Sequence, residues 1–189
     1  MFDLGPATTA MSHLIECVRD DQLADPTPCD DWTVADLLAH IHQFVDVFTS
    51  TARKDPVSPP DHLVDNWRTT IPAALDAMAA AWRVESAWTG EVSIGGVAMP
   101  AADNAVVAAE ELTVHGWDLA RATGQDFRAQ DTMIDRVEQF LTMFAPGTDA
   151  DAFGEGPFGP REPVPADADR LDRAIAGAGR DPRWSGGRD

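Results

Sequence analysis

The run Thr33-Val34-Ala35-Asp36-Leu37-Leu38-Ala39-His40 opens with the signature of a helix start. Thr33 is a good N-cap residue, and Asp36, three residues later, completes a pair that resembles a capping box. The apolar positions that follow recur at helical spacing until Pro56 and the loop around it: Val34, Leu37, Leu38, Ile41, Phe44, Val45 and Phe48. The pattern therefore predicts a helix over about 34–53, with one apolar stripe for burial in a helical core.

Similar patterns predict further helices on both sides of this one. They cover about 7–24, 61–82, 101–123, 129–144 and 168–176. The Ile71-Pro72 step predicts a break or kink, with Thr69 or Thr70 able to cap a restart. Gly124 is a plausible C-cap. Residues 86–99 lack helical periodicity, and their alternating apolar residues around Gly95-Gly96 suggest a short hairpin or extended crossover.

These elements predict an all-α fold, a four-helix bundle with a short extended or hairpin crossover and a C-terminal tail helix. With 189 residues, the chain fits a single domain over 1–189. The stretch over 147–165 is rich in Gly, Pro and acidic residues and is expected to be a loop, so that a C-terminal extension covers about 147–189.

The amino-acid composition indicates which classes of binding partner are disfavoured. The formal net charge is -18, from 32 acidic and 14 basic residues. This charge opposes binding to nucleic acid or to anionic membranes and favours a monomer or homodimer. No apolar run is long enough to cross a bilayer, and no signal-peptide pattern begins the chain, so we expect a cytoplasmic protein. Cys17 and Cys29 are expected to be reduced, with packing favoured for both.

A second segment carries the candidate chemistry: Glu111-Leu112-Thr113-Val114-His115-Gly116-Trp117-Asp118. Glu111 and His115 are four residues apart in a predicted helix, so their side chains project from the same face. Together with His40 they would form a two-His, one-carboxylate set that leaves coordination positions free on a divalent metal. The simpler interpretation of Glu111 and His115 is an ion pair on a partly exposed face.

Several neighbouring residues leave alternatives open. His40 and His42 flank the apolar stripe on opposite edges, and helical geometry does not choose between them. Asp118 could orient the ring of His115 or pair with Arg121 on the surface. Glu110 turns about 100° from Glu111 and is expected to be solvated. Trp32 and Trp117 are expected to be core aromatics, and His13 and His62 have no convergent partners in the sequence pattern.

Three groups of residues together resemble a known family. They are Thr27-Pro28-Cys29 with Trp32-Thr33-Val34, Asp36-Leu37-Leu38 and His40; Val114 to Ala120 with Ala122-Thr123-Gly124; and Phe158-Gly159-Pro160 through Gly179-Arg180-Asp181-Pro182. The first two resemble the mycothiol-dependent maleylpyruvate isomerase N-terminal-domain family, within the DinB-like superfamily. The third resembles the C-terminal part of a subgroup of actinobacterial metal-binding proteins.

The resemblance implies a DinB-like four-helix bundle with a divalent metal held by His40, Glu111 and His115, and it selects His40 over His42. Zinc is the first choice of ion, with nickel, manganese or iron as alternatives. The implied activity is that of a transferase or isomerase in which a low-molecular-weight thiol such as mycothiol adds to a small electrophilic substrate. The alternative is a non-catalytic metal-binding or regulatory sensor bundle.

One departure limits what the resemblance carries over. The isomerases of the family have a further C-terminal domain that contributes to their active site, whereas this chain ends soon after the predicted bundle. Maleylpyruvate isomerisation itself is therefore not expected here. The sequence pattern identifies no residue as a general base.

Overall fold

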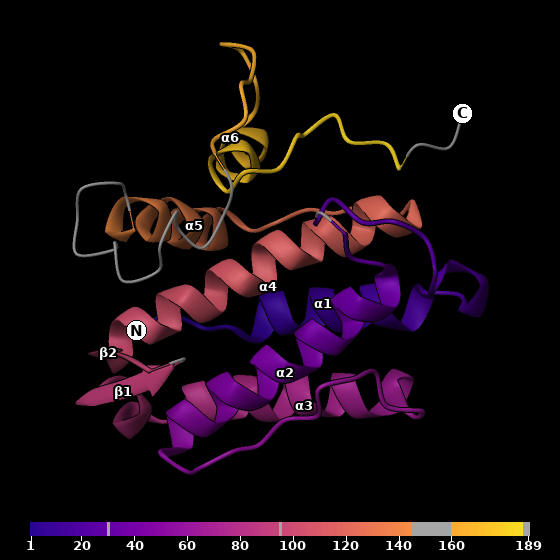
Figure 1. Ribbon diagram of the computed structural model, residues 1–189. Helices are drawn as coiled ribbons and strands as arrows, with labels where there is room; N and C mark the ends of the chain where they lie inside the picture. Colours follow the sequence, from indigo (N-terminus) through magenta and orange to yellow (C-terminus); the bar gives the residue numbers. More distant parts are fainter. Residues whose placement is uncertain (30, 95, 145–159, 187–189) are drawn as a thin grey trace.

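The computed structural model describes residues 1–29, 31–94, 96–144 and 160–186 (Figure 1). Within these ranges the helices and strands are α1 Gly5–Cys17, α2 Val34–Arg53, α3 Trp67–Trp82, β1 Glu91–Ile94, β2 Val97–Pro100, α4 Ala101–Thr123, α5 Asp131–Met143 and α6 Arg170–Gly177, with short 3-10 turns over Asp20–Gln22 and Glu85–Trp88. Residues 147–159 of the predicted loop over 147–165 lie outside the described residues. The predicted start of the C-terminal extension, at about 147, lies outside them as well.

The core of the molecule is a bundle of α1, α2, α3 and α4. α1 contacts α3 and α4, and α2 contacts the same two helices, so the four helices form a closed ring of neighbours. Fully buried side chains from all four meet in one apolar cluster, among them Ile15, Leu38, Leu75 and Leu112. The prediction of an all-α, DinB-like four-helix bundle is confirmed.

The sequence signals at α2 act as expected. The Thr33 hydroxyl accepts a hydrogen bond from the Asp36 backbone N–H, and the Asp36 carboxylate accepts one from the Thr33 backbone N–H. This reciprocal pair satisfies two N–H groups that the first turn of a helix leaves free. The helix ends at Arg53, and the C-cap residue Lys54 has a left-handed φ of 60°. The predicted range of 34–53 is therefore confirmed, and the apolar stripe of this helix is buried as predicted.

Two other helices are shorter than predicted. α1 ends at Cys17 rather than near residue 24 because Asp20 and Asp21 would place negative charge at the C-terminal end of the helix dipole. α3 begins at Trp67 rather than at 61, and it continues through Pro72 without the predicted break. Cys17 is exposed, so its predicted core role is wrong: it lies about 200° around α1 from the buried Ile15.

The predicted crossover is an antiparallel hairpin. β1 and β2 pair from Glu91 opposite Pro100 to Ile94 opposite Val97. The hairpin contacts both α2 and α4, and it leads directly into α4. It therefore covers one end of the interface between these two helices.

A second layer of helices lies outside the bundle. Figure 1 shows α5 alongside α4 and α6 against α5, in line with the contacts between them. A separate apolar cluster joins the three helices: Val114 and Trp117 of α4, Ile134 and Val137 of α5, and Ala174 and Ile175 of α6. Trp117 is thus buried as predicted, although in this outer cluster. This layer covers the face of α4 that points away from α2.

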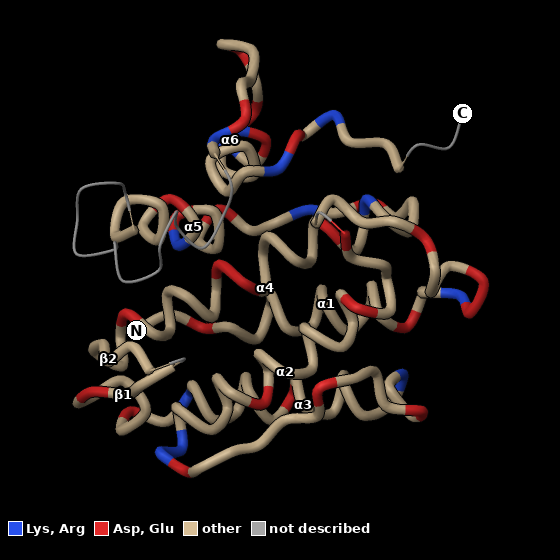
Figure 2. Tube along the Cα trace, in the orientation of Figure 1, with Lys and Arg blue, Asp and Glu red and all other residues tan. Residues whose placement is uncertain are grey.

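Charge is unevenly distributed along the chain. Figure 2 shows acidic positions spread over the bundle helices and their loops, while several basic positions lie on α6 and the segment that follows it. In the described part of the chain, no helix combines the length and the apolar character needed to cross a lipid bilayer.

Candidate metal centre

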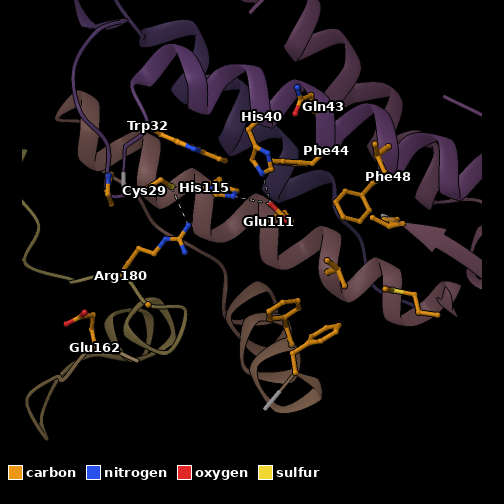
Figure 3. Close-up of a pocket in the computed structure, with 18 of the residues that line it drawn as sticks. Cys29, Trp32, His40, Gln43, Phe44, Phe48, Glu111, His115, Glu162 and Arg180 are labelled. Atoms are coloured by element: carbon orange, nitrogen blue, oxygen red, sulfur yellow. Dashed lines mark hydrogen bonds and ion pairs between the residues drawn. The ribbon is translucent and has the colours of Figure 1, made fainter. Parts of the chain in front are cut away.

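Three side chains predicted from the sequence converge between α2 and α4 (Figure 3). Glu111 Oε2 lies 3.3 Å from His40 Nε2 and 3.1 Å from His115 Nε2. The three potential ligand atoms all lie within 4.8 Å of one another. His40 comes from the face of α2 that packs on α4, whereas Glu111 and His115 are one turn apart on α4. The structure therefore brings together side chains separated by about seventy positions in the sequence.

The other histidines lie elsewhere. His42 is buried, with its Nε2 3.7 Å from Asp46 Oδ2, and it is not part of the convergent set. His13 and His62 are exposed and lie beside Glu16 and Asp61. Of the two candidates on α2, the structure thus places His40 at the site.

The ring of His115 is held from three sides. Its Nδ1 donates a hydrogen bond of 2.9 Å to Asp118 Oδ2, which leaves Nε2 directed at Glu111. The rings of Trp32 and Phe44 lie nearly parallel to the imidazole, at centroid distances of 6.2 and 6.1 Å. A carboxylate on the far nitrogen fixes the tautomer and orientation of an imidazole ligand. Of the two alternatives for Asp118, the structure selects the contact with His115.

Cys29 lies on the same side of the site as Asp118. It packs against the bundle core, as expected, but its thiol also donates a hydrogen bond of 3.1 Å to Asp118 Oδ2. Trp32, which was expected in the core, is only partly buried and lies 4.9 Å from the His40 ring between centroids. Both residues precede α2, so the loop before the capping box forms part of the site.

Arg180 reaches the same carboxylate from the segment after α6. Its Nη2 lies 3.2 Å from Asp118 Oδ2 and 3.4 Å from Cys29 Sγ. Burial disfavours the guanidinium charge, but the charge of Asp118 outweighs this effect, and the pKa of Arg180 is raised. The sequence pattern around Arg180 does not indicate this role, because nothing local relates Arg180 to Asp118, 62 residues earlier.

The prediction that Glu110 is solvated is wrong. Its side chain is fully buried, and neither carboxylate oxygen has a hydrogen-bond partner in the described part of the chain. Glu110 precedes Val114 by one turn and shares the face that packs toward α5. Burial, followed by the nearby charge of Glu111, raises the pKa of Glu110 well above its ordinary value of 4.5.

The charges of the convergent set stabilise one another. Burial alone would raise the pKa of Glu111, but hydrogen bonds from His115 and His40 outweigh it, so this pKa is lowered. Burial likewise disfavours the imidazolium of His115. The hydrogen bonds to Asp118, Cys29 and Glu111 outweigh it, and the pKa of His115 is raised well above 6.5. Both shifts favour an ion pair between a charged His115 and an ionised Glu111.

The same distances fit a shared cation. In a tetrahedral site with bonds of about 2.0–2.1 Å, neighbouring ligand atoms lie roughly 3.3 Å apart. The separations of 3.1 and 3.3 Å from Glu111 Oε2 to the two imidazole nitrogens match that edge. A hydrogen-bonded cluster and a three-ligand cation site are both compatible with this geometry.

The three side chains open onto a cavity of about 810 Å³. Its polar end is formed by His40, Glu111, His115, Cys29 and Arg180, and its remaining walls are largely apolar side chains from α2, α4, α5 and the hairpin. This volume is in the range of small-molecule sites. The site thus has room for a ligand beside the donor atoms.

A four-helix bundle that gathers two imidazoles and a carboxylate in an open pocket defines a DinB-like domain. Residues 4–120 match the mycothiol maleylpyruvate isomerase N-terminal domain family, and the chain belongs to this family, which is associated with mycothiol. The matched range contains Cys29, Trp32, His40, Glu111, His115 and Asp118, whereas Arg180 lies beyond it.

Two uncharacterized proteins of Mycobacterium tuberculosis, one from each of two strains, are similar over most of the chain. Each is 29% identical over 186 residues, which cover 92% of this chain and 93% of the relative. The aligned share is larger than the matched family domain of residues 4–120, so the similarity extends into the rest of the chain. No solved structure gave a significant match.

Proposed function

We propose that this protein is a divalent-metal-dependent enzyme in which a low-molecular-weight thiol of the mycothiol type attacks a small electrophile. His40, Glu111 and His115 would hold the ion, with zinc as the first choice. The observation that carries the proposal is the convergence of three donor atoms, within 4.8 Å of one another, at the polar end of a large pocket. Three protein ligands leave at least one coordination position open, as in catalytic rather than structural sites.

The chain's own residues would prepare this site for a reaction. Asp118 orients His115, and Trp32 and Phe44 limit the access of water to its ring. A divalent ion in the site would lower the pKa of a bound thiol and so supply a thiolate at neutral pH. Glu111 would serve as a ligand rather than as a general base, because both imidazoles contact its Oε2.

The proposed reaction forms one carbon–sulfur bond and then follows one of two courses. The sulfur of the thiol forms a bond to an electrophilic carbon, and the thiol proton is released. In a transfer, the leaving group departs with its electron pair. In an isomerisation, the carbon–sulfur bond breaks again after the substrate has rearranged, and the thiol is regenerated.

A turnover assay with matched proteins tests the proposal. The purified protein, loaded with one equivalent of zinc, is incubated with N-acetylcysteine and 1-chloro-2,4-dinitrobenzene, and formation of the thioether is followed by absorbance. We expect catalysis by the zinc-loaded protein and background rates for the chelated protein and for His40→Ala. Metal binding without a rate above background for this or any other thiol–electrophile pair tested would favour the sensor function instead.

Metal affinity is expected to depend on pH through His115. Because its pKa is raised in the metal-free protein, an ion must displace its proton at neutral pH. Apparent affinity should therefore rise by about tenfold per pH unit up to the pKa of His115, and then level off. Competition with a chromogenic chelator between about pH 5 and about pH 9 measures this slope. A flat profile over this range would exclude His115 as a ligand.

A further inference from the structure

The pocket continues well beyond the donor atoms, and its far part is apolar. We call this part the apolar arm: Phe44, Val47 and Phe48 of α2, Val107 of α4, and Ile94 and Met99 of the hairpin. Val47, Val107, Ile94 and Met99 are only partly buried, so they present apolar surface to the cavity. Figure 3 shows Phe44 beside His40 and Phe48 farther along α2, away from Cys29 and Arg180.

The length of the apolar arm follows from the helices that line it. From His40 to Phe48 along α2, and from His115 to Val107 along α4, the chain advances eight residues, or about 12 Å. Both paths lead toward the hairpin, which contacts α2 and α4. The arm therefore starts at the convergent side chains and extends by about two helical turns between two antiparallel helices.

We propose that the apolar arm binds the body of the electrophile, so that the substrate class is an electrophile carrying a long aliphatic or aromatic group. This inference rests on the proposed function, because it places the reactive end of the substrate at His40, Glu111 and His115. A small, wholly polar electrophile would leave the arm filled with water that apolar walls hold poorly. A long apolar group displaces that water and buries the partly exposed side chains as well.

A series of metal-binding probes tests this inference on the full, zinc-loaded chain. The probes are acetohydroxamate, butanohydroxamate, hexanohydroxamate and octanohydroxamate, and each is paired with the methyl ester of the same acid. We expect the dissociation constant of the hydroxamates to fall by about two- to fourfold for each added methylene, and so by at least about fiftyfold across the series. The esters should bind more weakly at every chain length and show the same dependence on length.

Two variants that fill the arm provide the structural control. Val47→Trp introduces a large ring from α2, and Val107→Trp does the same from α4. Val57→Trp places the same ring on a loop where the native side chain is 44% exposed. The first two variants should keep their zinc and their affinity for acetohydroxamate but lose the dependence on chain length. Val57→Trp should retain that dependence.

The outcomes separate this inference from the function on which it rests. Affinity that is independent of chain length in the zinc-loaded protein would overturn the apolar arm as a substrate site, whatever the metal does. Equal affinity for hydroxamate and ester would instead overturn the metal centre. Chain-length dependence that persists unchanged in both Val47→Trp and Val107→Trp would place the apolar group elsewhere on the protein and would also overturn the inference.

Discussion

His115→Ala is expected to lower the affinity for zinc by more than a hundredfold. Loss of a residue that only orients a metal ligand typically costs about ten- to hundredfold in affinity, and loss of a ligand itself should exceed this. The substitution also leaves Glu111 with one imidazole partner instead of two. Elemental analysis after dialysis and titration with a competing chelator measure the effect.

Two further variants make this result interpretable. His40→Ala removes a proposed ligand whose loss should disturb the core less, since its side chain is 30% exposed against 6% for His115. It should also lose zinc, whereas His13→Ala, on the exposed face of α1, should bind zinc like the unaltered protein. Full zinc occupancy in folded His40→Ala, as judged by circular dichroism, would disprove the three-ligand assignment.

Glu110→Gln is expected to stabilise the metal-free protein at neutral pH. The pKa of Glu110 is raised in the folded state above its ordinary value of 4.5. Its contribution to stability is therefore greatest below pH 4.5 and is lost as the pH rises through the folded-state pKa. A neutral amide of the same shape avoids this loss, so the free energy of unfolding at pH 7 should increase by about 1–3 kcal/mol.

Urea denaturation in the presence of a chelator, at about pH 7 and at about pH 4, measures the difference. The gain should shrink toward zero at the lower pH, where the carboxyl group is protonated in both states. Glu85→Gln, in an exposed turn, is the matched control, and it should change stability by less than about 0.5 kcal/mol. A Glu110→Gln protein that is less stable than the native chain at pH 7 would show that the carboxylate has a partner that stabilises its ionised form.

Much of the bundle could be predicted because its signals are local. The capping pair Thr33 and Asp36 and the apolar stripe after it indicate α2 at about its observed limits, and Gly124 ends α4 with a φ of 70°. The spacing of Glu111 and His115 likewise places both side chains on one face of α4, wherever that helix lies. These features depend on interactions within one or two helical turns, and they survive in any arrangement of the helices.

The failed predictions concern burial, which depends on neighbours. Glu110 was expected to be solvated because helical geometry turns it away from Glu111, but α5 packs over that face of α4. Cys17 was assigned to the core from the helical pattern around it, yet it faces solvent. For Glu110 the helical periodicity was correct, but it could not supply that a second helix would cover this face. The error at Cys17 is of another kind, because the periodicity itself turns this side chain about 200° from the buried Ile15.

The amino-acid sequence was sufficient to indicate which segments form helices, although not where α1 ends or α3 begins, and it also indicated the residues capable of holding a metal and the resemblance to the family. The folded chain alone chose His40 over His42 by geometry, joined Asp118 to both His115 and Arg180, and opened an apolar arm beside the donor atoms. The physical reason is the distance along the chain over which each kind of interaction acts. Helix capping and side-chain spacing act over a few residues, whereas a binding site forms where segments far apart in the sequence are brought together by burial of their apolar surfaces.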